Sequence, residues 1–369
     1  MRYCKRCVMP DTRPYIQFDN NGVCYPCRAS EYLRTVDWKK RWEELEKLAD
    51  QYRGMNGNYY DCMITASGGK DSYYQTYIMK EKLGMNPLLV SVDNFSWTDT
   101  GRHNIDNLRD TFSVDLHTIS LNPVVCRELF RQAFFKIGSP TWYFDKAIYA
   151  YPLMLAKRLG IPFIVYGEDT SFLYGGPDPR ETPSALKQLE NDVVKPVPWE
   201  EWHVHPKMVN PGMLNMNDMK TIHPVFLSYY LPWSGYQNML FAQSRGFRTL
   251  DDTGEWHREG FFEQYDQIDC MGYLVHPWMK FPKYGHARVT DVASLWIREG
   301  RLSREKAVQS VINDDWKLDG SALHDFLSFT GIKKKEFWSV VDHFANKEIL
   351  EKRDGDWRLK PCIEELLQG

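Results

Sequence analysis

The sequence predicts an α/β protein built on a parallel sheet, with a cysteine-rich module before the sheet and a small helical module after it. Three observations support this prediction. Short apolar stretches alternate with helical patterns between residues 59 and 166, two pairs of cysteines fall within the first 27 residues, and helical patterns dominate beyond residue 290. Alternating strands and helices are typical of a parallel sheet that helices cover on both faces.

The composition limits the classes of protein to consider. The chain of 369 residues has 46 Lys and Arg against 49 Asp and Glu, a net charge of -3. Nucleic-acid-binding domains usually carry a surplus of positive charge. The sequence has no apolar run of the roughly 18 residues that a membrane helix needs, and its first residues, MRYCKRC, do not resemble a secretory signal. We therefore expect a cytoplasmic protein that binds neither nucleic acid nor membrane.

Residues 1–36 form the first predicted module, and its cysteines have the spacing of a zinc site. Cys4-x-x-Cys7 and Cys24-x-x-Cys27 are 16 residues apart, and two such knuckles supply the four thiolates of a tetrahedral zinc ion. Because thiolates fill all four positions, the expected role of the zinc is structural. Disulfides are the alternative, which a reducing compartment disfavours. The other cysteines lack metal spacing: they are Cys62, Cys126, Cys270 and Cys362.

The predicted core spans residues 37–289 and opens with a helix over 37–52. The elements that follow are, in order, strand 59–65, helix 72–83, strand 87–92, helix 101–112, strand 115–121, helices 124–136 and 145–159, and strand 161–166.

Two further regions follow these elements. The segment of about 170–235 is rich in Pro, Trp, Asn and Met without clear periodicity, so we expect an insertion over the active face. Helical patterns at 303–313 and 333–345, with a turn at Asp354-Gly355, predict a C-terminal helical module over 290–369.

The strongest chemical signal is the run Ser67-Gly68-Gly69-Lys70-Asp71-Ser72, placed between a predicted strand and a predicted helix. Consecutive glycines let backbone amides approach a phosphate, and the helix directs its positive end to the same place. The hydroxyls of Ser67 and Ser72 can donate hydrogen bonds, and Asp71 is a candidate ligand for Mg2+. The run is not a Walker A loop, in which Ser or Thr follows the lysine. A glycine-rich turn that binds no ligand is the alternative.

The S-G-G-x-D-S run resembles the PP-loop of N-type ATP pyrophosphatases, which include the synthetase parts of GMP, NAD and asparagine synthetases and several tRNA-modifying enzymes. The resemblance implies an adenine nucleotide alpha hydrolase-like core. It also implies cleavage of ATP between the α and β phosphates, transfer of AMP to a carbonyl oxygen, and displacement of AMP by a nitrogen or sulfur nucleophile.

Two other strand ends fit the same resemblance. Asp93 follows the strand over 87–92, where relatives contact the adenosine, and Gly167, Glu168 and Asp169 follow the strand over 161–166, where relatives hold pyrophosphate and Mg2+. Ligands lie at the carboxyl ends of strands in such sheets. The resemblance thus makes Asp169 a partner of Asp71 at Mg2+. The alternatives are a turn former at Asp93 and a helix cap at Glu168-Asp169.

A second resemblance covers nearly the whole chain. The opening MRYCKRCVMPDTRP, the second cysteine pair, SGGKDS and KYGHARVTD (residues 283–291) occur in the order found in N-acetyl sugar amidotransferases, the family of WbpG and PseA. The family is linked to bacterial surface polysaccharides, including the O-antigen of LPS, and to nonulosonic acids. The resemblance implies that ATP and ammonia convert an acetamido group of a sugar to an acetamidino group. The last motif departs from the family pattern KFGFGRATD at Tyr284, His286 and Val289.

Several residues are candidates for this chemistry. Charge on the leaving phosphate requires a cation, and Lys70 and Lys283 are the candidates for it, with Lys280 ranked lower. The candidates for binding the sugar are Arg258, Tyr284, Arg288 and the tryptophans Trp202, Trp233 and Trp256. For each lysine the alternative is a solvated surface charge, and for each tryptophan it is a place in the core.

The source of ammonia must lie elsewhere. None of the cysteines outside the N-terminal module stands in a glutaminase-type G-x-C-x-G run. We therefore expect a separate glutaminase subunit and a cyclase-like subunit that channels ammonia, as the family resemblance also implies. His203, His205 and His223 have loose spacing for a second metal, and ordinary loop histidines are the alternative.

Two rival functions remain. A tRNA thiolase also joins zinc knuckles to a PP-loop, but it needs a basic face and usually a second cysteine pair or an iron–sulfur site. A non-catalytic scaffold for a glutaminase is the other rival, which the intact S-G-G-K-D-S run disfavours.

Overall fold

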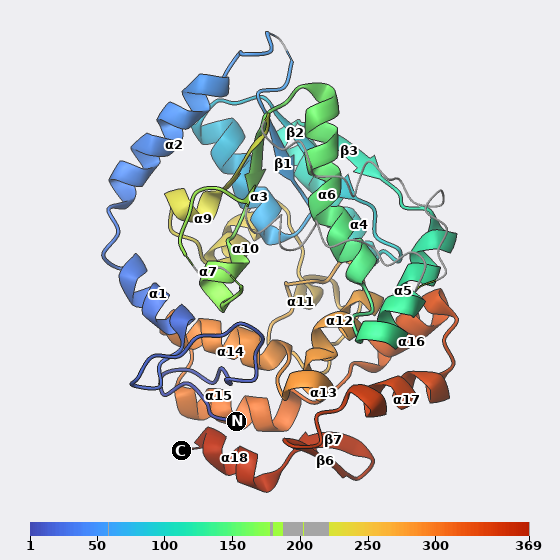
Figure 1. Ribbon diagram of the computed structural model, residues 1–369. Coiled ribbons are helices and arrows are strands. Elements are labelled where there is room, and N and C mark those ends of the chain that lie inside the picture. The colour runs from blue at the N-terminus through green and yellow to red at the C-terminus, as the bar shows by residue number, and fades with distance from the viewer. Residues whose placement is uncertain (58, 178–179, 187–201, 203–220, 369) are drawn as a thin grey trace.

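The computed structural model describes residues 1–57, 59–177, 180–186, 202 and 221–368 (Figure 1). Its centre is a five-stranded parallel sheet with the strand order β3-β2-β1-β4-β5. The strands are β1 (Cys62–Thr65), β2 (Pro87–Val92), β3 (Asp115–Ile119), β4 (Phe163–Tyr166) and β5 (His223–Phe226). The predicted parallel α/β sheet is confirmed, and the strand order reverses between β1 and β4, where open sheets of this kind bind ligands.

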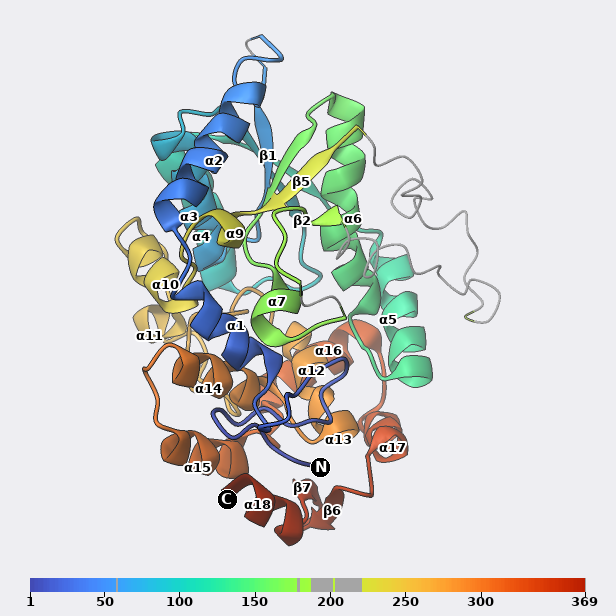
Figure 2. The ribbon, with the colours of Figure 1, turned by 60° about the vertical axis from the view of Figure 1, so that its left-hand side comes forward.

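Helices cover both faces of this sheet, because its short strands have apolar side chains on both sides (Figures 1 and 2). Met63 and Ile164 point into the core under α5 (Pro123–Ile137) and α6 (Trp142–Leu159). Ile64 and Val165, one residue further on, point into the other core. That second face is covered by α2 (Trp38–Tyr52), α3 (Lys70–Thr76), the π-helix η1 (Tyr77–Lys82), α4 (Asp99–Phe112) and α10 (Gly235–Gln243).

The segment 170–235 contains regular structure that the sequence analysis did not predict. Its described part holds α7 (Thr170–Tyr174), the edge strand β5 and α9 (Leu227–Tyr230). β5 pairs in parallel with β4 over four residues, a stretch too short to show a period. Pro224 lies within this strand, and proline is tolerated there because β5 is at the edge of the sheet.

The chain after β5 is mainly helical and shares a core with the sheet. Phe134 of α5 stacks on Phe337 at 5.0 Å between ring centroids and meets Phe326 edge-on at 5.7 Å. The helical patterns at 303–313 and 333–345 are confirmed as α15 and α17. The elements here are α11 (Leu250–Thr253), η4 (Gly272–Leu274), α12 (Val275–Trp278), α13 (Lys280–Tyr284), α14 (Arg288–Arg298), α15 (Arg304–Asp314), α16 (Gly320–Thr330), α17 (Lys334–Phe344), β6 (Leu350–Arg353), β7 (Asp356–Leu359) and α18 (Pro361–Gln368).

The predicted turn at Asp354-Gly355 joins an antiparallel hairpin of β6 and β7, which the sequence analysis did not foresee. Both turn residues have positive φ, +53° and +91°, as the tight turns of two-residue hairpins require.

The N-terminal module ends in α1 (Tyr25–Leu33) and packs against the C-terminal part of the chain. Tyr3 and Val8 join the same apolar cluster as Val289 and Leu367, and the N-terminal segment lies beside α14 and α15 (Figures 1 and 2). Chain segments that are far apart in sequence thus meet below the carboxyl edge of the sheet. Within the described residues, no helix has the length and apolar character needed to cross a membrane.

Candidate active site

A cavity of about 520 Å³ opens at the carboxyl edge of the sheet, beside the point where the strand order reverses. This volume lies within the usual range for small-molecule sites, roughly 300–1,000 Å³. All six residues of the predicted 67–72 loop line it, together with Gly167 and Glu168 after β4. Asn94, two residues past the end of β2, lines it as well, so the structure brings together all three strand ends that the sequence singled out.

The 67–72 loop is held open by its own hydroxyls. The Ser67 amide donates to Ser72 Oγ at 3.1 Å, and the Gly69 amide donates to Ser67 Oγ at 3.3 Å. Gly68 has φ +81°, and a Cβ there would lie 2.8 Å from the backbone nitrogen of Ile105. The loop follows β1 in a shape that only glycine permits at this position.

The first turn of α3 lines the cavity through Lys70, Asp71 and Ser72. Gly69 is the N-cap and offers no side-chain hydrogen bond to the first turn. The first amides of a helix have no partner within the helix and carry its positive dipole end, so they suit a phosphate.

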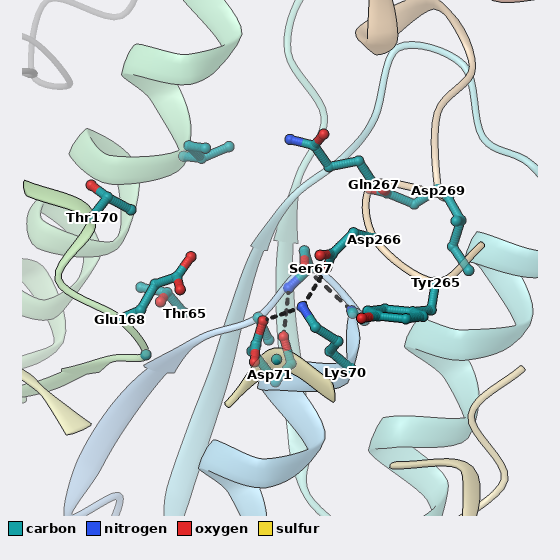
Figure 3. A pocket seen from close by; sticks show the side chains of 18 of the residues that line it. Thr65, Ser67, Lys70, Asp71, Glu168, Thr170, Tyr265, Asp266, Gln267 and Asp269 are labelled. Carbon is teal, nitrogen blue, oxygen red and sulfur yellow. Dashed lines mark hydrogen bonds and ion pairs between the residues drawn. The ribbon is translucent and has the colours of Figure 1, made fainter. Parts of the chain in front are cut away.

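Lys70 is the most strongly held cation in the cavity. Its Nζ donates to Asp71 Oδ2 at 2.7 Å and to Asp266 Oδ1, and the side chain is only 7% exposed (Figure 3). Burial lowers the pKa of Lys70, but the negative charges of Asp266 and Asp71 outweigh it and hold the pKa well above its usual value. Asn238 of α10 donates to the second oxygen of Asp71 at 2.7 Å. Lys70 and Asp71 are thus fixed and charged.

Asp266 belongs to a segment that the sequence analysis missed. Residues 265–269 line the cavity facing the 67–72 loop, and Asp266 lies beside Lys70 (Figure 3). Asp266 also joins Lys70 to Arg288, whose Nη2 lies 2.7 Å from Asp266 Oδ2. Burial raises the pKa of Asp266, but Lys70 and Arg288 hold it below its usual value. The segment has neither periodicity nor a known motif, so no local signal indicated it.

Glu168, and not Asp169, is the acidic residue after β4 that lines the cavity. It points in from the side facing Lys70 (Figure 3). Burial, followed by the negative charge of Asp71, raises the pKa of Glu168 to about 7. The Asp169 carboxylate instead accepts from the Phe172 amide at 3.1 Å as the N-cap of α7, outside the described cavity lining. Asp169 therefore does not lie where its expected role at Mg2+ requires it, and Glu168 is the acidic residue that shares the cavity with Asp71.

Asp93 is also absent from the described cavity lining. Its carboxylate accepts from Ser120 Oγ at 2.7 Å and from Trp97 Nε1, which fixes the turn after β2. The next residue, Asn94, lines the cavity and donates to Asp269 at 2.6 Å. The predicted strand end is thus at the site, but through Asn94.

Of the predicted sugar-binding residues, Arg288 alone is part of the described lining. Arg258 is fully buried: its guanidinium donates to Glu263 Oε2 at 2.9 Å and to the Asp266 carbonyl at 2.6 Å. Arg258 therefore supports the segment that carries Asp266. Tyr284 ends α13 and stacks on His286, with ring centroids 6.2 Å apart.

Lys283 lies away from the described cavity lining, which corrects its expected catalytic position. Its Nζ donates to the Ile137 and Gly138 carbonyls at 3.0 and 3.4 Å, where a lysine complements the C-terminal end of α5. Lys280, one turn earlier, instead pairs with Asp291, which does line the cavity.

The remaining aromatic and histidine candidates are mostly structural. Trp202 packs edge-on against Trp142 at 5.0 Å, and Trp256 Nε1 donates to Asp319 at 3.3 Å. Trp233 packs beside Gly167, where a Cβ would meet its ring at 2.9 Å. His203 and His205 lie outside the described residues, whereas His223 Nδ1 shares a hydrogen bond of 2.9 Å with Tyr52.

The four N-terminal cysteines form a separate, buried cluster that could bind a metal. Their sulfurs lie within 4.8 Å of one another, with Cys4–Cys27 at 3.9 Å and Cys7–Cys24 at 3.6 Å. A tetrahedral zinc–thiolate site with bonds of about 2.3 Å separates its sulfurs by roughly 3.8 Å. Burial lowers the pKa of nearby Arg298, but the negative charge of the cysteines outweighs it and raises the pKa. The cluster therefore fits a zinc ion, with a buried cation beside it.

Comparisons with known proteins bear on this description. Residues 259–363 match the family described as LPS biosynthesis protein WbpG-like, C-terminal domain, a span that includes Asp266 and Arg288. An uncharacterized protein of Methanocaldococcus jannaschii is 27% identical over 187 residues, which are 50% of this chain and 65% of that protein. The chain thus spans less than two thirds of that relative.

Two solved structures share low similarity with the chain. NMN synthetase from Francisella tularensis has 13% identity and a TM-score of 0.26, covering 57% of this chain and 94% of its own. The tRNA thiolase NcsA from Methanococcus maripaludis, solved with its 4Fe-4S cluster, has 11% identity and a TM-score of 0.23, covering 94% and 90%. Neither superposition is close enough to support a shared function.

The cysteine cluster predicts that Cys24→Ser lowers the metal content and the melting temperature together, because metal binding contributes directly to the folding of such modules. Elemental analysis and thermal unfolding measure the two effects, and we expect close to one zinc per wild-type chain. Cys362→Ser, which removes an exposed thiol, is the matched control. Full metal content and an unchanged melting temperature in Cys24→Ser contradict a metal site.

The raised pKa of Glu168 predicts a stability that depends on pH. The folded carboxyl ionises near pH 7 instead of at its ordinary pKa of 4.5, so the free energy of unfolding falls as pH rises through this window. Glu168→Gln removes this loss, and the variant gains stability relative to wild type between about pH 5 and pH 8. Urea unfolding without Mg2+ measures the gain. Glu46→Gln, at an exposed position of α2, is the control. If the difference in unfolding free energy between Glu168→Gln and wild type is the same at about pH 5 and about pH 8, the raised pKa of Glu168 is contradicted.

Proposed function

Residues 259–363 form a WbpG-like C-terminal domain, and on this premise we propose that the chain is an ATP-dependent N-acetyl sugar amidotransferase. The observation that carries the proposal is the bridge Lys70–Asp266–Arg288. It places a phosphate-type loop and two residues of the WbpG-like domain around one cavity. A nucleotide and a second substrate held there would react with each other.

The nucleotide end of the cavity is formed by the 67–72 loop. Its glycines bring the backbone to the edge of the cavity, α3 adds its positive end, and Lys70 adds a buried charge. Negative charge that develops on the leaving pyrophosphate would meet donors that are already in place. Such preorganised donors cost no rearrangement during the reaction.

Asp71 and Glu168 are the residues we assign to Mg2+. They approach the cavity from two strand ends, and the charge of Asp71 contributes to the raised pKa of Glu168. Oxygen ligands of this kind are those that Mg2+ prefers, and the ion would neutralise charge on the phosphates. When the cation is present, Glu168 is expected to ionise at a lower pH.

The proposed reaction activates an amide. The acetamido oxygen of the sugar attacks the α-phosphorus of ATP, its bond to phosphorus forms, and the bond to the pyrophosphate oxygen breaks. The amide nitrogen loses its proton and an O-adenylyl imidate results. Ammonia then adds to the imidate carbon and AMP departs with the former amide oxygen. The product carries an acetamidino group, and ATP ends as AMP and pyrophosphate.

Ammonia has to reach this cavity as the free base. A glutaminase subunit and a cyclase-like subunit that channels its product are the proposed partners, since ammonia is mostly protonated at neutral pH. The described lining contains no cysteine, so the residues that form the cavity offer no thiol nucleophile of their own. The absence of cysteine from the described lining also gives no support to the tRNA thiolase alternative, which usually needs a second cysteine pair or an iron–sulfur site.

The test incubates the chain with ATP, Mg2+, ammonium and a panel of diacetamido sugars: UDP-linked uronates and pseudaminic-type and legionaminic-type acids. Mass spectrometry follows the exchange of an amide oxygen for NH, and chromatography follows AMP. We expect one sugar to exchange an amide oxygen for NH while AMP forms in the same reaction. Lys70→Met should show neither product. The matched control is Lys283→Met, whose lysine caps α5 and should leave turnover unchanged.

The outcomes separate the alternatives. If AMP forms but every sugar in the panel is unchanged, the protein is still an ATP pyrophosphatase, but the proposal of a sugar substrate is wrong. If ATP turnover requires a sulfur donor, the result supports the tRNA thiolase alternative. No AMP under any condition, with the glutaminase present, contradicts catalysis and favours a scaffold. Loss of turnover in Lys283→Met but not in Lys70→Met contradicts the assignment of the phosphate lysine.

A further inference from the structure

Arg13 comes from the N-terminal module, yet its side chain lines the cavity. Its Nη1 donates to Asp291 Oδ1 at 2.6 Å, and its Nε donates to the Gly175 carbonyl at 3.2 Å. The Arg13 side chain is 17% exposed, so these two hydrogen bonds hold it in place while part of it remains accessible. Neither the 67–72 loop nor the Mg2+ assignment uses this residue.

The loop between the two cysteine pairs is fixed directly to the rim of the cavity. Thr12 Oγ1 donates to the Tyr284 carbonyl at 2.6 Å. Gly175, at the end of α7, has φ +82°, and a Cβ there would lie 2.6 Å from Ile16 Cδ1. These contacts on both sides of Arg13 leave its backbone little freedom. The cysteine cluster thus holds the loop that positions Arg13.

The charge around Arg13 favours an anion. Arg13 and Lys280 share the single carboxylate of Asp291, whose side chain is 6% exposed. Burial raises the pKa of Asp291, but Lys280 and Arg13 outweigh it and hold the pKa well below its usual value. Two cations against one carboxylate give this group of three side chains a net positive charge, and no described residue accepts a hydrogen bond from Nη2 of Arg13.

Aromatic and apolar side chains stand next to this surplus charge. Leu295 and Trp296 follow Asp291 by about one turn of α14 and line the cavity, as do Tyr174 and Tyr236. Flat apolar faces beside a charged donor suit a sugar ring that carries an acidic group. Arg288, which also lines the cavity, lies at the start of the same helix.

We propose that Arg13 forms an anion subsite that holds an oxyanion of the sugar substrate, either a carboxylate or a phosphate. Arginine suits this role because its planar fork binds two oxygens at once. The identity of the ligand as a sugar rests on the proposed function, whereas the anion site itself rests on the contacts above. The N-terminal module then contributes to substrate binding as well as to folding.

The first test needs no sugar. Protein saturated with α,β-methylene-ATP and Mg2+, so that the 67–72 loop is filled, is titrated with sodium sulfate, and sodium chloride of equal ionic strength is the salt control. We expect sulfate to raise the melting temperature of wild type more than that of Arg13→Gln, because its general stabilising effect acts on both and only wild type has the anion site. Arg2→Gln, which changes an exposed arginine of the same module, should respond as wild type. An equal response of Arg13→Gln and wild type overturns the proposal.

A second variant covers the case in which Arg13→Gln does not fold. Arg13→Lys keeps the charge but replaces the planar guanidinium, which donates from separate nitrogens to Asp291 and to the Gly175 carbonyl, by a single ammonium nitrogen. Its response to sulfate is expected to be smaller than that of wild type. An equal response contradicts the role of the guanidinium.

Calorimetry with two sugars then identifies the oxyanion. A free diacetamido nonulosonic acid offers a carboxylate without phosphate, and a UDP-linked diacetamido sugar without a carboxylate offers only phosphates. Arg13→Gln should lower the affinity for the sugar that carries the recognised group by about tenfold to a hundredfold. The affinity for methylene-ATP should not change.

The outcomes separate the two proposals. If sulfate binding depends on Arg13 but wild type binds neither sugar, the anion subsite is supported and the proposed sugar amidotransferase function is wrong. A sugar that binds wild type and Arg13→Gln equally leaves the proposed function and overturns the subsite. If Arg13→Gln lowers the affinity for methylene-ATP as much as the affinity for the sugar, Arg13 belongs to the nucleotide site, and this result also overturns the proposed subsite.

Discussion

The ammonium group of Lys70 is buried in this cavity, and the rest of the site depends on how its charge is balanced. An unpaired ammonium is costly away from water, so a lysine at this depth requires carboxylates beside it. Asp71 comes from the same loop, but Asp266 comes from nearly two hundred residues further along the chain. The segment that carries Asp266 must therefore fold against the loop whenever the lysine is in place.

This constraint explains several features around the cavity. Arg258 is buried because it supports the Asp266 segment through Glu263 and the Asp266 backbone. Arg288 shares the carboxylate of Asp266 with Lys70, so α14 begins beside the 67–72 loop. The N-terminal module in turn packs on α14 and places Arg13 at the same cavity. A chain of paired charges thus connects three parts of the sequence to one site.

Much of the fold could be predicted from the sequence because its signals are local. The 67–72 loop, the cysteine pairs and four of the five strands each have a signature within a few residues of chain. Strand β5 escaped prediction because four residues with a proline show no period. The cysteine cluster and the residues of the loop were placed correctly, since spacing alone determines them.

The errors at the site share one cause: the backbone position was predicted correctly, but the direction of the side chain was not. Asp93 and Asp169 stand at the expected strand ends, yet they support a turn and a helix, while Asn94 and Glu168 face the cavity. Lys283 lies one turn beyond Lys280 and caps another helix. Asp266 and Arg13 depend on contacts across the whole chain, which no local pattern of residues reveals.

A double-mutant cycle between Lys70→Met and Asp266→Asn, followed by urea unfolding of the full chain, tests the central claim most directly. If Asp266 balances the buried charge of Lys70, each single variant loses stability by about 3 kcal/mol, as expected when one partner of a buried pair is removed. The double variant then loses clearly less than the sum, with a coupling energy above about 1 kcal/mol. Additive losses contradict the pairing and, with it, the connection between the 67–72 loop and the segment that carries Asp266.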